Sequence, residues 1–210
     1  MTNTLVIGAG VVGRAVVHKC AQFASELGNI TIASRTLSKC DEIIESVHRK
    51  GNLRDSSRTL TSAQLDAKDP AAAAKLIREK NASIVINVAS PFCNLPIMEA
   101  CLKTGAHYID TAIYEREEVI NKPAPWYAQD EWKLRDRFAE RGATAVLSCG
   151  FDQGTVNAFC AHAAKHEFDE IETIDIMDVN GGDHDRFFAT NFDPEVNLRE
   201  ILEDVIFCCS

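Results

Sequence analysis

Two hydrophobic patterns alternate along most of the chain. Short, mostly apolar runs predict strands that are covered on both faces of a sheet; they are Thr4–Gly8, Asn29–Ser34, Arg58–Asp66, Ser83–Val88, His107–Asp110 and Thr144–Cys149. Patterns with helical period predict the connecting helices Val11–Leu27, Lys39–Lys50, Pro70–Lys80, Leu95–Lys103, Asp130–Arg141 and Thr155–Lys165. Strands that alternate with helices of this length predict parallel pairing through crossover helices, so the fold class is α/β with a doubly wound parallel sheet.

The pattern changes near residue 169. Ile171–Val179 alternates apolar and acidic side chains, which predicts a half-exposed strand. We therefore expect a Rossmann-type domain over residues 1–168 and the beginning of a second, α+β substrate and dimerisation domain over residues 169–210. Within the first domain, Glu115–Trp132 contains two prolines and predicts a loop.

Composition narrows the class of partner. The 210 residues are 46% hydrophobic and 25% charged, as in ordinary globular proteins, and the net charge of −9 argues against nucleic-acid binding. The first residues lack a basic segment followed by a long apolar run, and no stretch reaches the roughly 18 apolar residues of a membrane span. We expect a cytoplasmic protein without membrane contact.

The eight cysteines form no Cys-x-x-Cys pair, and most lie in apolar runs, which predicts buried free thiols. His162 and His166 have the spacing of two metal ligands on one helix face, but no third ligand lies near them in the sequence. We therefore predict no metal site.

A glycine motif follows the first expected strand. Gly8, Gly10 and Gly13 form G-x-G-x-x-G between a strand and a helix. The first glycine permits the turn, the second lets a pyrophosphate approach the backbone, and the third lets the helix pack closely. Because a helix N-terminus attracts phosphate, Val11 and Val12 join the glycines in a predicted dinucleotide site.

The end of the second expected strand decides between the two nicotinamide cofactors. NAD sites place a carboxylate there for the ribose hydroxyls, whereas this chain has Ser34, Arg35 and Thr36. A guanidinium and hydroxyls suit the 2′-phosphate of NADP(H), so we predict NADP(H) as the cofactor. The alternative is that Arg35 and the nearby Lys39 are ordinary solvated bases.

Further candidates follow from the rule that ligands lie beyond the carboxyl ends of parallel strands. Asp66 ends the third strand and is a candidate acceptor for the adenine amino group; Ala89, Ser90 and Thr111 end the fourth and fifth strands and are candidate cofactor contacts. The sixth strand ends at Cys149, shortly before Asp152. Each of these positions also has an ordinary structural explanation.

Several motifs together resemble those of the saccharopine dehydrogenase-like reductases. They are VIGAGVVG, ASRTLSK, VINVASP, YIDTA, SCGFDQG and NGGDHDRFFATNFDPEVNLRE, and they extend to about Ile201. Within that family the chain is most similar to the polyamine-forming branch. The resemblance implies NADPH-dependent reduction of the imine formed from aspartate β-semialdehyde and a diamine, either 1,3-diaminopropane or putrescine, by a homodimer.

The implied chemistry needs a carboxylate near the iminium and near the distal ammonium of the diamine. Asp110, Cys149 and Asp152 are the predicted catalytic residues, and Asp110 is the preferred carboxylate. Ser90, Pro91, Asp110 and Asp183 are the predicted substrate contacts.

Two features depart from the family pattern. The family has G-x-D-P-G where Gly150–Gly154 has Gln153 in place of proline. The segment after Glu203 does not resemble the family's continuation, which predicts a truncated substrate domain. Two other hypotheses therefore remain: a non-catalytic NADP(H)-binding module, and a reductase of the same superfamily with saccharopine or homospermidine as product.

Overall fold

The computed structural model describes residues 2–118, 129–177, 185 and 193–202. The strands are β1 (Asn3–Ile7), β2 (Asn29–Ser34), β3 (Leu60–Gln64), β4 (Ile84–Asn87), β5 (His107–Asp110) and β6 (Ala145–Val146). The helices are α1 (Val11–Gln22), α2 (Ala24–Leu27), α3 (Leu37–Arg49), α4 (Pro70–Glu79), the short 3₁₀ turn η1 (Pro91–Cys93), α5 (Asn94–Thr104), α6 (Gln129–Trp132), α7 (Arg135–Glu140), α8 (Thr155–His166) and α9 (Pro194–Leu202).

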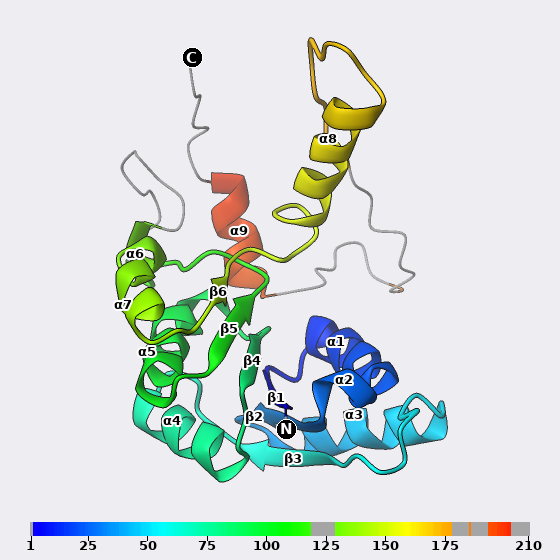
Figure 1. Ribbon diagram of the computed structural model, residues 1–210, viewed down its shortest axis with the longest axis vertical. Helices are drawn as coiled ribbons and strands as arrows, with labels where there is room; N and C mark the ends of the chain where they lie inside the picture. The colour runs from blue at the N-terminus through cyan, green and yellow to red at the C-terminus, as the bar shows by residue number, and fades with distance from the viewer. Residues whose placement is uncertain (1, 119–128, 178–184, 186–192, 203–210) are drawn as a thin grey trace.

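The strands form one parallel sheet in the order β3-β2-β1-β4-β5-β6 (Figure 1). The order reverses at β1, where Ile7 pairs with Ala33 on one side and with Asn87 on the other. This is the Rossmann arrangement, and the predicted doubly wound α/β fold is confirmed. Its switch point between β1 and β4 is where such sheets bind ligands.

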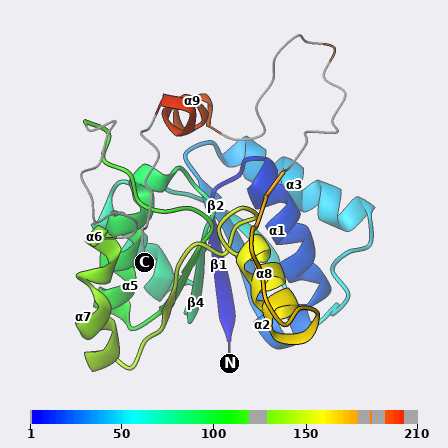
Figure 2. The same cartoon turned by 90° about the horizontal axis from the view of Figure 1, so that it is seen from above.

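Helices cover both faces of the sheet. Figure 2 shows α1–α3 on one side and α5–α7 on the other. Successive side chains of a strand point to opposite faces, so Val6 packs in a core with Val17 of α1 and Val47 of α3. Leu5 and Ile7 belong to the opposite core, which also contains Ile77, Ile97 and Met98.

Several predicted elements differ in the structure. The predicted helix Asp130–Arg141 is divided into α6 and α7, and α6 occupies the end of the predicted loop Glu115–Trp132. The first helix is divided into α1 and α2 at Phe23. The sixth strand shortens to β6 because Ser148 adopts a left-handed conformation with φ 59°. The predicted strand Ile171–Val179 is wrong for residues 171–177, which are not paired with any described strand; a strand needs a neighbour for its backbone hydrogen bonds. Residues 178 and 179 lie outside the described residues.

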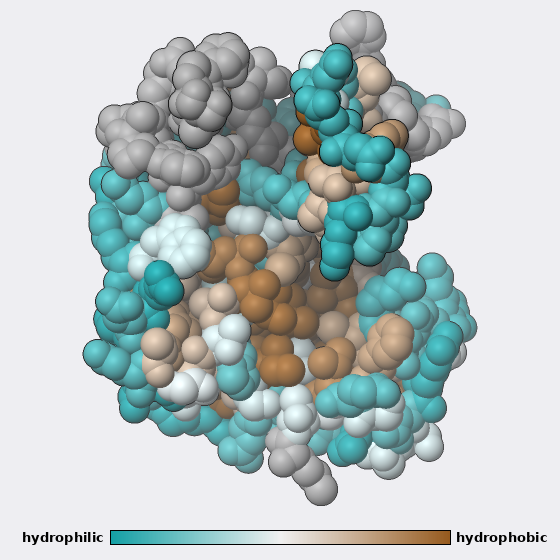
Figure 3. Space-filling model, turned by 45° about the horizontal axis from the view of Figure 1, so that its top comes forward, coloured by the Kyte–Doolittle hydropathy of each residue, from teal (hydrophilic) through white to brown (hydrophobic). Residues whose placement is uncertain are grey.

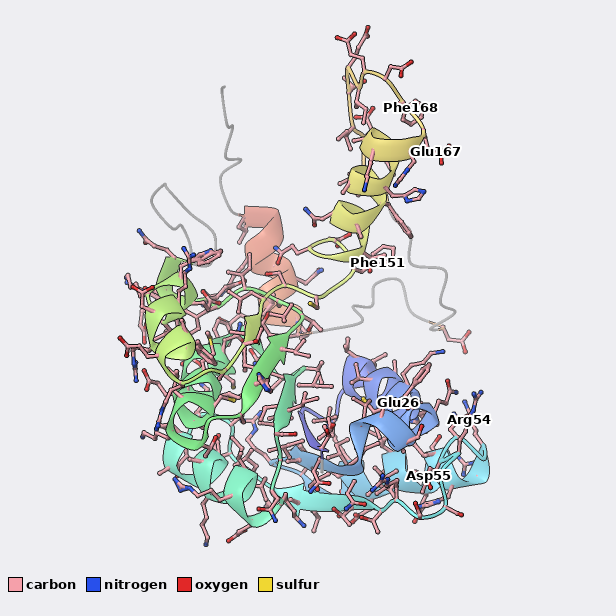
Figure 4. The ribbon with its side chains drawn as sticks, viewed as in Figure 1. Glu26, Arg54, Asp55, Phe151, Glu167 and Phe168 are labelled. Carbon is pink, nitrogen blue, oxygen red and sulfur yellow. The ribbon has the colours of Figure 1, made fainter. Side chains whose placement is uncertain are left out.

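Helix α8 extends away from the sheet, and α9 lies closer to it (Figure 1). None of the residues of α8 is buried. Phe151 lies near the base of α8 and Phe168 near its far end (Figure 4), and they are 61% and 60% exposed. In the described part of the chain, no helix combines the length and apolar character required to cross a bilayer.

Candidate functional site

A cavity of about 1260 Å³ opens at the switch point of the sheet. Its wall is formed by the glycine loop, by the segments that follow β2 to β6, and by the start of α9. In Figure 3, apolar residues gather in a central hollow of the visible face and polar residues surround it. The volume exceeds the roughly 300–1,000 Å³ of pockets for drug-sized ligands, so the cavity has room for a large ligand or for two ligands together.

The three loop glycines are required for different reasons. A Cβ on Gly8, which has φ +120°, would lie 2.5 Å from Val88 O, and one on Gly13 would lie 2.0 Å from Gly8 O. Both contacts would be with backbone atoms, so the absence of a side chain at these two glycines lets β1, β4 and α1 pack closely. A Cβ on Gly10 would meet nothing within 4 Å, and Gly10 lines the cavity. Its bare backbone therefore leaves space that no other part of the described chain fills.

Helix α1 begins at this loop without a capping side chain. Gly10 is its N-cap residue, and no acidic side chain lies in its first turn. Val11 and Val12 line the cavity and are 67% and 42% exposed. The first N–H groups of a helix have no partner within the helix and attract anions. Together with the open space at Gly10, they suit the pyrophosphate of a dinucleotide.

The Ser34–Thr36 segment lines the cavity next to this loop. The Ser34 hydroxyl donates to Thr36 O at 2.9 Å and accepts from Thr36 N at 3.1 Å. Ser34 therefore shapes the turn that carries Arg35. The Arg35 carbonyl accepts from Gln64 Nε2 at 3.1 Å, and among the described residues its guanidinium forms no hydrogen bond or ion pair. A cation held at a fixed backbone position suits a 2′-phosphate.

Asp66 and Lys68 line the cavity at the end of β3. Asp66 Oδ1 accepts from the backbone N–H of Lys68 at 3.1 Å, so one carboxylate oxygen is occupied by the turn. The ammonium of Lys68 forms an ion pair with Glu117, which follows β5. Sequence reasoning missed Lys68, since no local signal indicates which loop lies opposite it.

The segment after β4 contributes Ala89, Ser90 and Pro91 to the cavity wall. The Asn87 side chain accepts from Ala89 N at 3.1 Å and donates to Asn94 Oδ1 at 2.8 Å. Ser90 Oγ is buried and has no hydrogen-bond partner in the described structure. A buried hydroxyl without a partner is costly, and a ligand in this cavity could supply one.

The structure does not bring Asp110 to the cavity surface. Asp110 is 1% exposed. Its Oδ1 accepts from Ser148 N at 2.6 Å and its Oδ2 accepts from Asn94 Nδ2 at 3.3 Å. Burial raises the pKa of Asp110 to about 6, while the hydrogen bonds from Ser148 and Tyr108 lower it and the Glu131 charge raises it. Asp110 therefore holds the left-handed Ser148 in place beneath the cavity and has no free edge for a substrate.

The segments that follow β5 and β6 line the cavity. Thr111, Cys149 and Asp152 all line it. A Cβ on Gly150 would lie 2.4 Å from Thr111 O, so glycine allows the ends of β5 and β6 to meet. Partial burial and the Asp110 charge raise the pKa of the exposed Cys149 thiol, which disfavours a thiolate nucleophile. Asp152 is exposed in the cavity.

Helix α9 closes the remaining side with Asp193, Glu195 and Val196. Arg199, 6% exposed, holds this helix in place. It donates to Glu195 Oε1 at 2.7 Å and to the carbonyls of Arg116 at 2.9 Å and Glu117 at 2.7 Å. Its guanidinium also lies 5.0 Å from the Phe92 ring centre. Sequence analysis did not predict this helix.

Most of the predicted site residues therefore converge on the cavity. Those that line it are Gly8, Gly10, Val11, Val12, Ser34, Arg35, Thr36, Asp66, Ala89, Ser90, Pro91, Thr111, Cys149 and Asp152. Gly13 lies behind the loop, Asp110 lies beneath the strand ends, and Asp183 lies outside the described residues.

The predicted state of the cysteines is largely confirmed. Six cysteines lie in the described part of the chain, and all six are free. Cys20, Cys40, Cys93 and Cys101 are buried, whereas Cys160 is partly exposed and Cys149 is exposed in the cavity. His162 and His166 stack at 4.8 Å on α8, and neither belongs to a group of three or more metal-binding side chains among the described residues.

Comparisons with known proteins agree with this geometry. The family model described as saccharopine dehydrogenase NADP binding domain matches residues 4–146. A carboxynorspermidine synthase from Vibrio cholerae is 49% identical over 98% of this chain and 50% of the relative. A carboxynorspermidine synthase from Vibrio alginolyticus is 47% identical over 97% of this chain and 49% of the relative.

A third relative, a carboxyaminopropylagmatine dehydrogenase from Synechocystis sp., is 41% identical over 97% of this chain and 48% of the relative. The chain thus spans about half the length of these curated relatives. Among solved structures, apo saccharopine dehydrogenase (L-Glu forming) from Saccharomyces cerevisiae matches with a TM-score of 0.58 and 19% identity, covering 79% of this chain and 31% of that one. This likeness concerns the fold alone.

Proposed function

The chain belongs to the family of saccharopine dehydrogenase NADP binding domains and binds NADP(H), and from this premise we propose an imine reductase of polyamine synthesis. Its substrate is the imine formed from L-aspartate β-semialdehyde and a diamine, and its product is a carboxylated polyamine such as carboxynorspermidine or carboxyspermidine. The names of the relatives from Vibrio support this proposal.

The observation that carries the proposal is the division of charge around the cavity. Arg35, Lys39 and Lys68 line it from the ends of β2 and β3. Most of the carboxylates line it from the segments after β5 and β6 and from the start of α9, namely Glu115, Glu117, Asp152, Asp193 and Glu195. Asp66 lies on the β3 side, and Glu117 is paired with Lys68. Cations suit the phosphates of the cofactor, and carboxylates suit the ammonium groups of a diamine.

The reaction needs little from the protein beyond placement. The cofactor supplies a hydride when bound. That hydride would convert the C=N bond of the iminium to CH–NH, at the expense of NADPH. Because a protonated imine already carries its nitrogen proton, no further acid is required. The protein has to bind the two partners together and exclude water.

We assign the ammonium contacts to Asp152 and Asp193. Asp152 is exposed in the cavity beyond β6. Asp193 precedes α9, and its Oδ1 accepts from Glu195 N at 3.0 Å, which fixes its direction. Glu195 is partly neutralised by Arg199 at 2.7 Å, so its attraction for an ammonium is weaker. Ser90, with its buried and unpartnered hydroxyl, is assigned to the cofactor side of the reaction site.

The test is NADPH oxidation with aspartate β-semialdehyde and each of 1,3-diaminopropane, putrescine and agmatine. Agmatine is included because of the name of the Synechocystis relative. Turnover with one of these amines supports the proposal. The variants Asp152→Asn and Asp193→Asn are expected to raise KM for the amine about tenfold and to leave NADPH affinity unchanged.

Other outcomes identify the two remaining hypotheses. NADPH binding without turnover of any imine indicates a binding module, and NADPH oxidation only with the imine precursors of saccharopine or homospermidine indicates another reductase of the superfamily. The homodimer implied by the resemblance is part of the proposal, and sedimentation analysis of the same protein tests it.

A further inference from the structure

A cation from the third strand end lies in the NADP(H) cavity with an acidic partner from across the sheet. Lys68 lines the cavity together with Arg35 and Lys39. The side chains of Lys68 and Glu117 are 50% and 48% exposed, and they form an ion pair. β3, which precedes Lys68, is an edge strand, whereas β5, which precedes Glu117, lies on the other side of the switch point. The pair therefore spans the site.

The backbone of Lys68 is firmly held. Asp66 Oδ1 accepts from Lys68 N at 3.1 Å, and the adjacent Ala67 is buried at 8% exposure. One residue later Asp69 caps α4, accepting from Ala71 N at 2.8 Å and Ala72 N at 3.0 Å. The ammonium therefore extends from a rigid strand-to-helix turn, and only its own side-chain torsions decide what it contacts.

Lys68 and Arg35 line the same cavity, and their charges influence common neighbours. Burial raises the pKa of the Cys93 thiol, and the charges of Lys68 and Arg35 both lower it. The hydrogen bond from Lys68 to Glu117 raises the pKa of the ammonium, whereas the charge of Arg35 lowers it. The two cations thus act on the same small region around Cys93, at the β2 and β3 ends of the cavity.

We propose that Lys68 recognises the 2′-phosphate of NADP(H) together with Arg35, and that Glu117 competes with the phosphate for the Lys68 ammonium. A dianionic phosphate attracts an ammonium more strongly than a carboxylate does and is repelled by Glu117. Lys68 therefore favours the phosphorylated cofactor, and Glu117 limits its affinity. This assignment rests on cofactor binding and does not depend on imine reduction.

The two members of the pair give opposite predictions. Lys68→Met is expected to weaken NADP⁺ binding about tenfold, measured by calorimetric titration, and to leave NAD⁺ binding within about twofold. Glu117→Gln is expected to strengthen NADP⁺ binding about threefold, because it removes the repulsion and frees Lys68. Lys68→Arg keeps the charge and is expected to retain the preference for NADP⁺.

Both substitutions break the same ion pair. Opposite effects on NADP⁺ affinity therefore distinguish a role of the pair in cofactor recognition from a purely structural role. If the pair only holds two loops together, both variants shift NADP⁺ and NAD⁺ binding in the same direction, and the proposal is overturned. It is also overturned if Lys68→Met weakens both cofactors equally. The matched control is the Lys75–Glu79 pair, an exposed ion pair on α4 at 3.7 Å; Lys75→Met and Glu79→Gln are expected to change neither affinity.

Discussion

At the scale of single residues, depth below the surface separates two aspartates that the sequence presents as alternatives. Asp110 ends β5 and Asp152 follows β6, and the sequence offers both as partners for an ammonium. Asp110 is 1% exposed and bonded to Ser148 and Asn94, whereas Asp152 is exposed in the cavity. Asp110 therefore stabilises the turn beneath the site, and of the two aspartates only Asp152 lines the cavity.

The buried Asp110 should make stability depend on pH. Its pKa rises from 3.8 to about 6, chiefly by burial, so the folded chain holds this proton more tightly than the unfolded chain. Stability is therefore lost as the pH rises through this window. We expect Asp110→Asn to become more stable relative to the wild type by about 1 kcal/mol between pH 5 and pH 7.5, measured by urea unfolding.

The matched control for this experiment is Asp136→Asn, since Asp136 is exposed on α7. If the difference in free energy of unfolding between Asp110→Asn and the wild type stays constant with pH, the raised pKa of Asp110 is contradicted.

At the scale of elements, the strand–loop–helix unit β1–α1 places its glycines for two purposes. Gly13 faces backbone, because a Cβ there would lie 2.0 Å from Gly8 O. Gly10 faces open space, has φ −86°, and lines the cavity. The motif thus combines one position that serves packing with one that leaves open space in the cavity.

This division predicts different defects for two alanine variants. Gly13→Ala is expected to lower the free energy of unfolding by about 2 kcal/mol or more, since α1 has to move away from β1. Gly10→Ala is expected to keep its thermal unfolding midpoint, because its φ is ordinary. It should nevertheless weaken NADP⁺ binding about tenfold or more by filling the space next to the pyrophosphate. Equal losses of stability in both variants contradict the assignment.

At the scale of the whole molecule, α9 joins the nucleotide-binding sheet through one buried cation. Arg199 donates to the carbonyls of Arg116 and Glu117, 83 and 82 residues earlier in the chain. The guanidinium of Arg199 also lies over the ring of Phe92, which follows β4. The carboxylates of Asp193 and Glu195 therefore reach the cavity only while this contact holds.

Removing the cation should release the helix. Arg199→Met is expected to increase amide hydrogen exchange in α9 by a factor of ten or more, since breaking a buried charged contact costs about 3–5 kcal/mol. Exchange in β1 and β4 should not change. Arg137→Met removes an exposed Arg–Glu pair with Glu99 and serves as the control, with an expected effect under about 1 kcal/mol. Unchanged exchange in α9 contradicts the role of Arg199.

Local patterns in the sequence were enough to predict the alternation of strands and helices, the phosphate loop, and the replacement of an acid by Ser34 next to the cation Arg35. These features are local, because hydrophobic period and glycine spacing act over a few residues. Within the described residues, the same local reasoning was wrong for residues 171–177, where a strand pattern has no neighbour with which to pair.

Which polar groups face the cavity depends on contacts between distant parts of the chain. The pairing of Lys68 with Glu117, the burial of Asp110 and the clamp at Arg199 each join segments from different parts of the chain. Residues that are 49 and 83 positions apart meet here. Such contacts depend on the order of strands in the sheet and on how loops return over its edge, and neither leaves a periodic signal in the sequence.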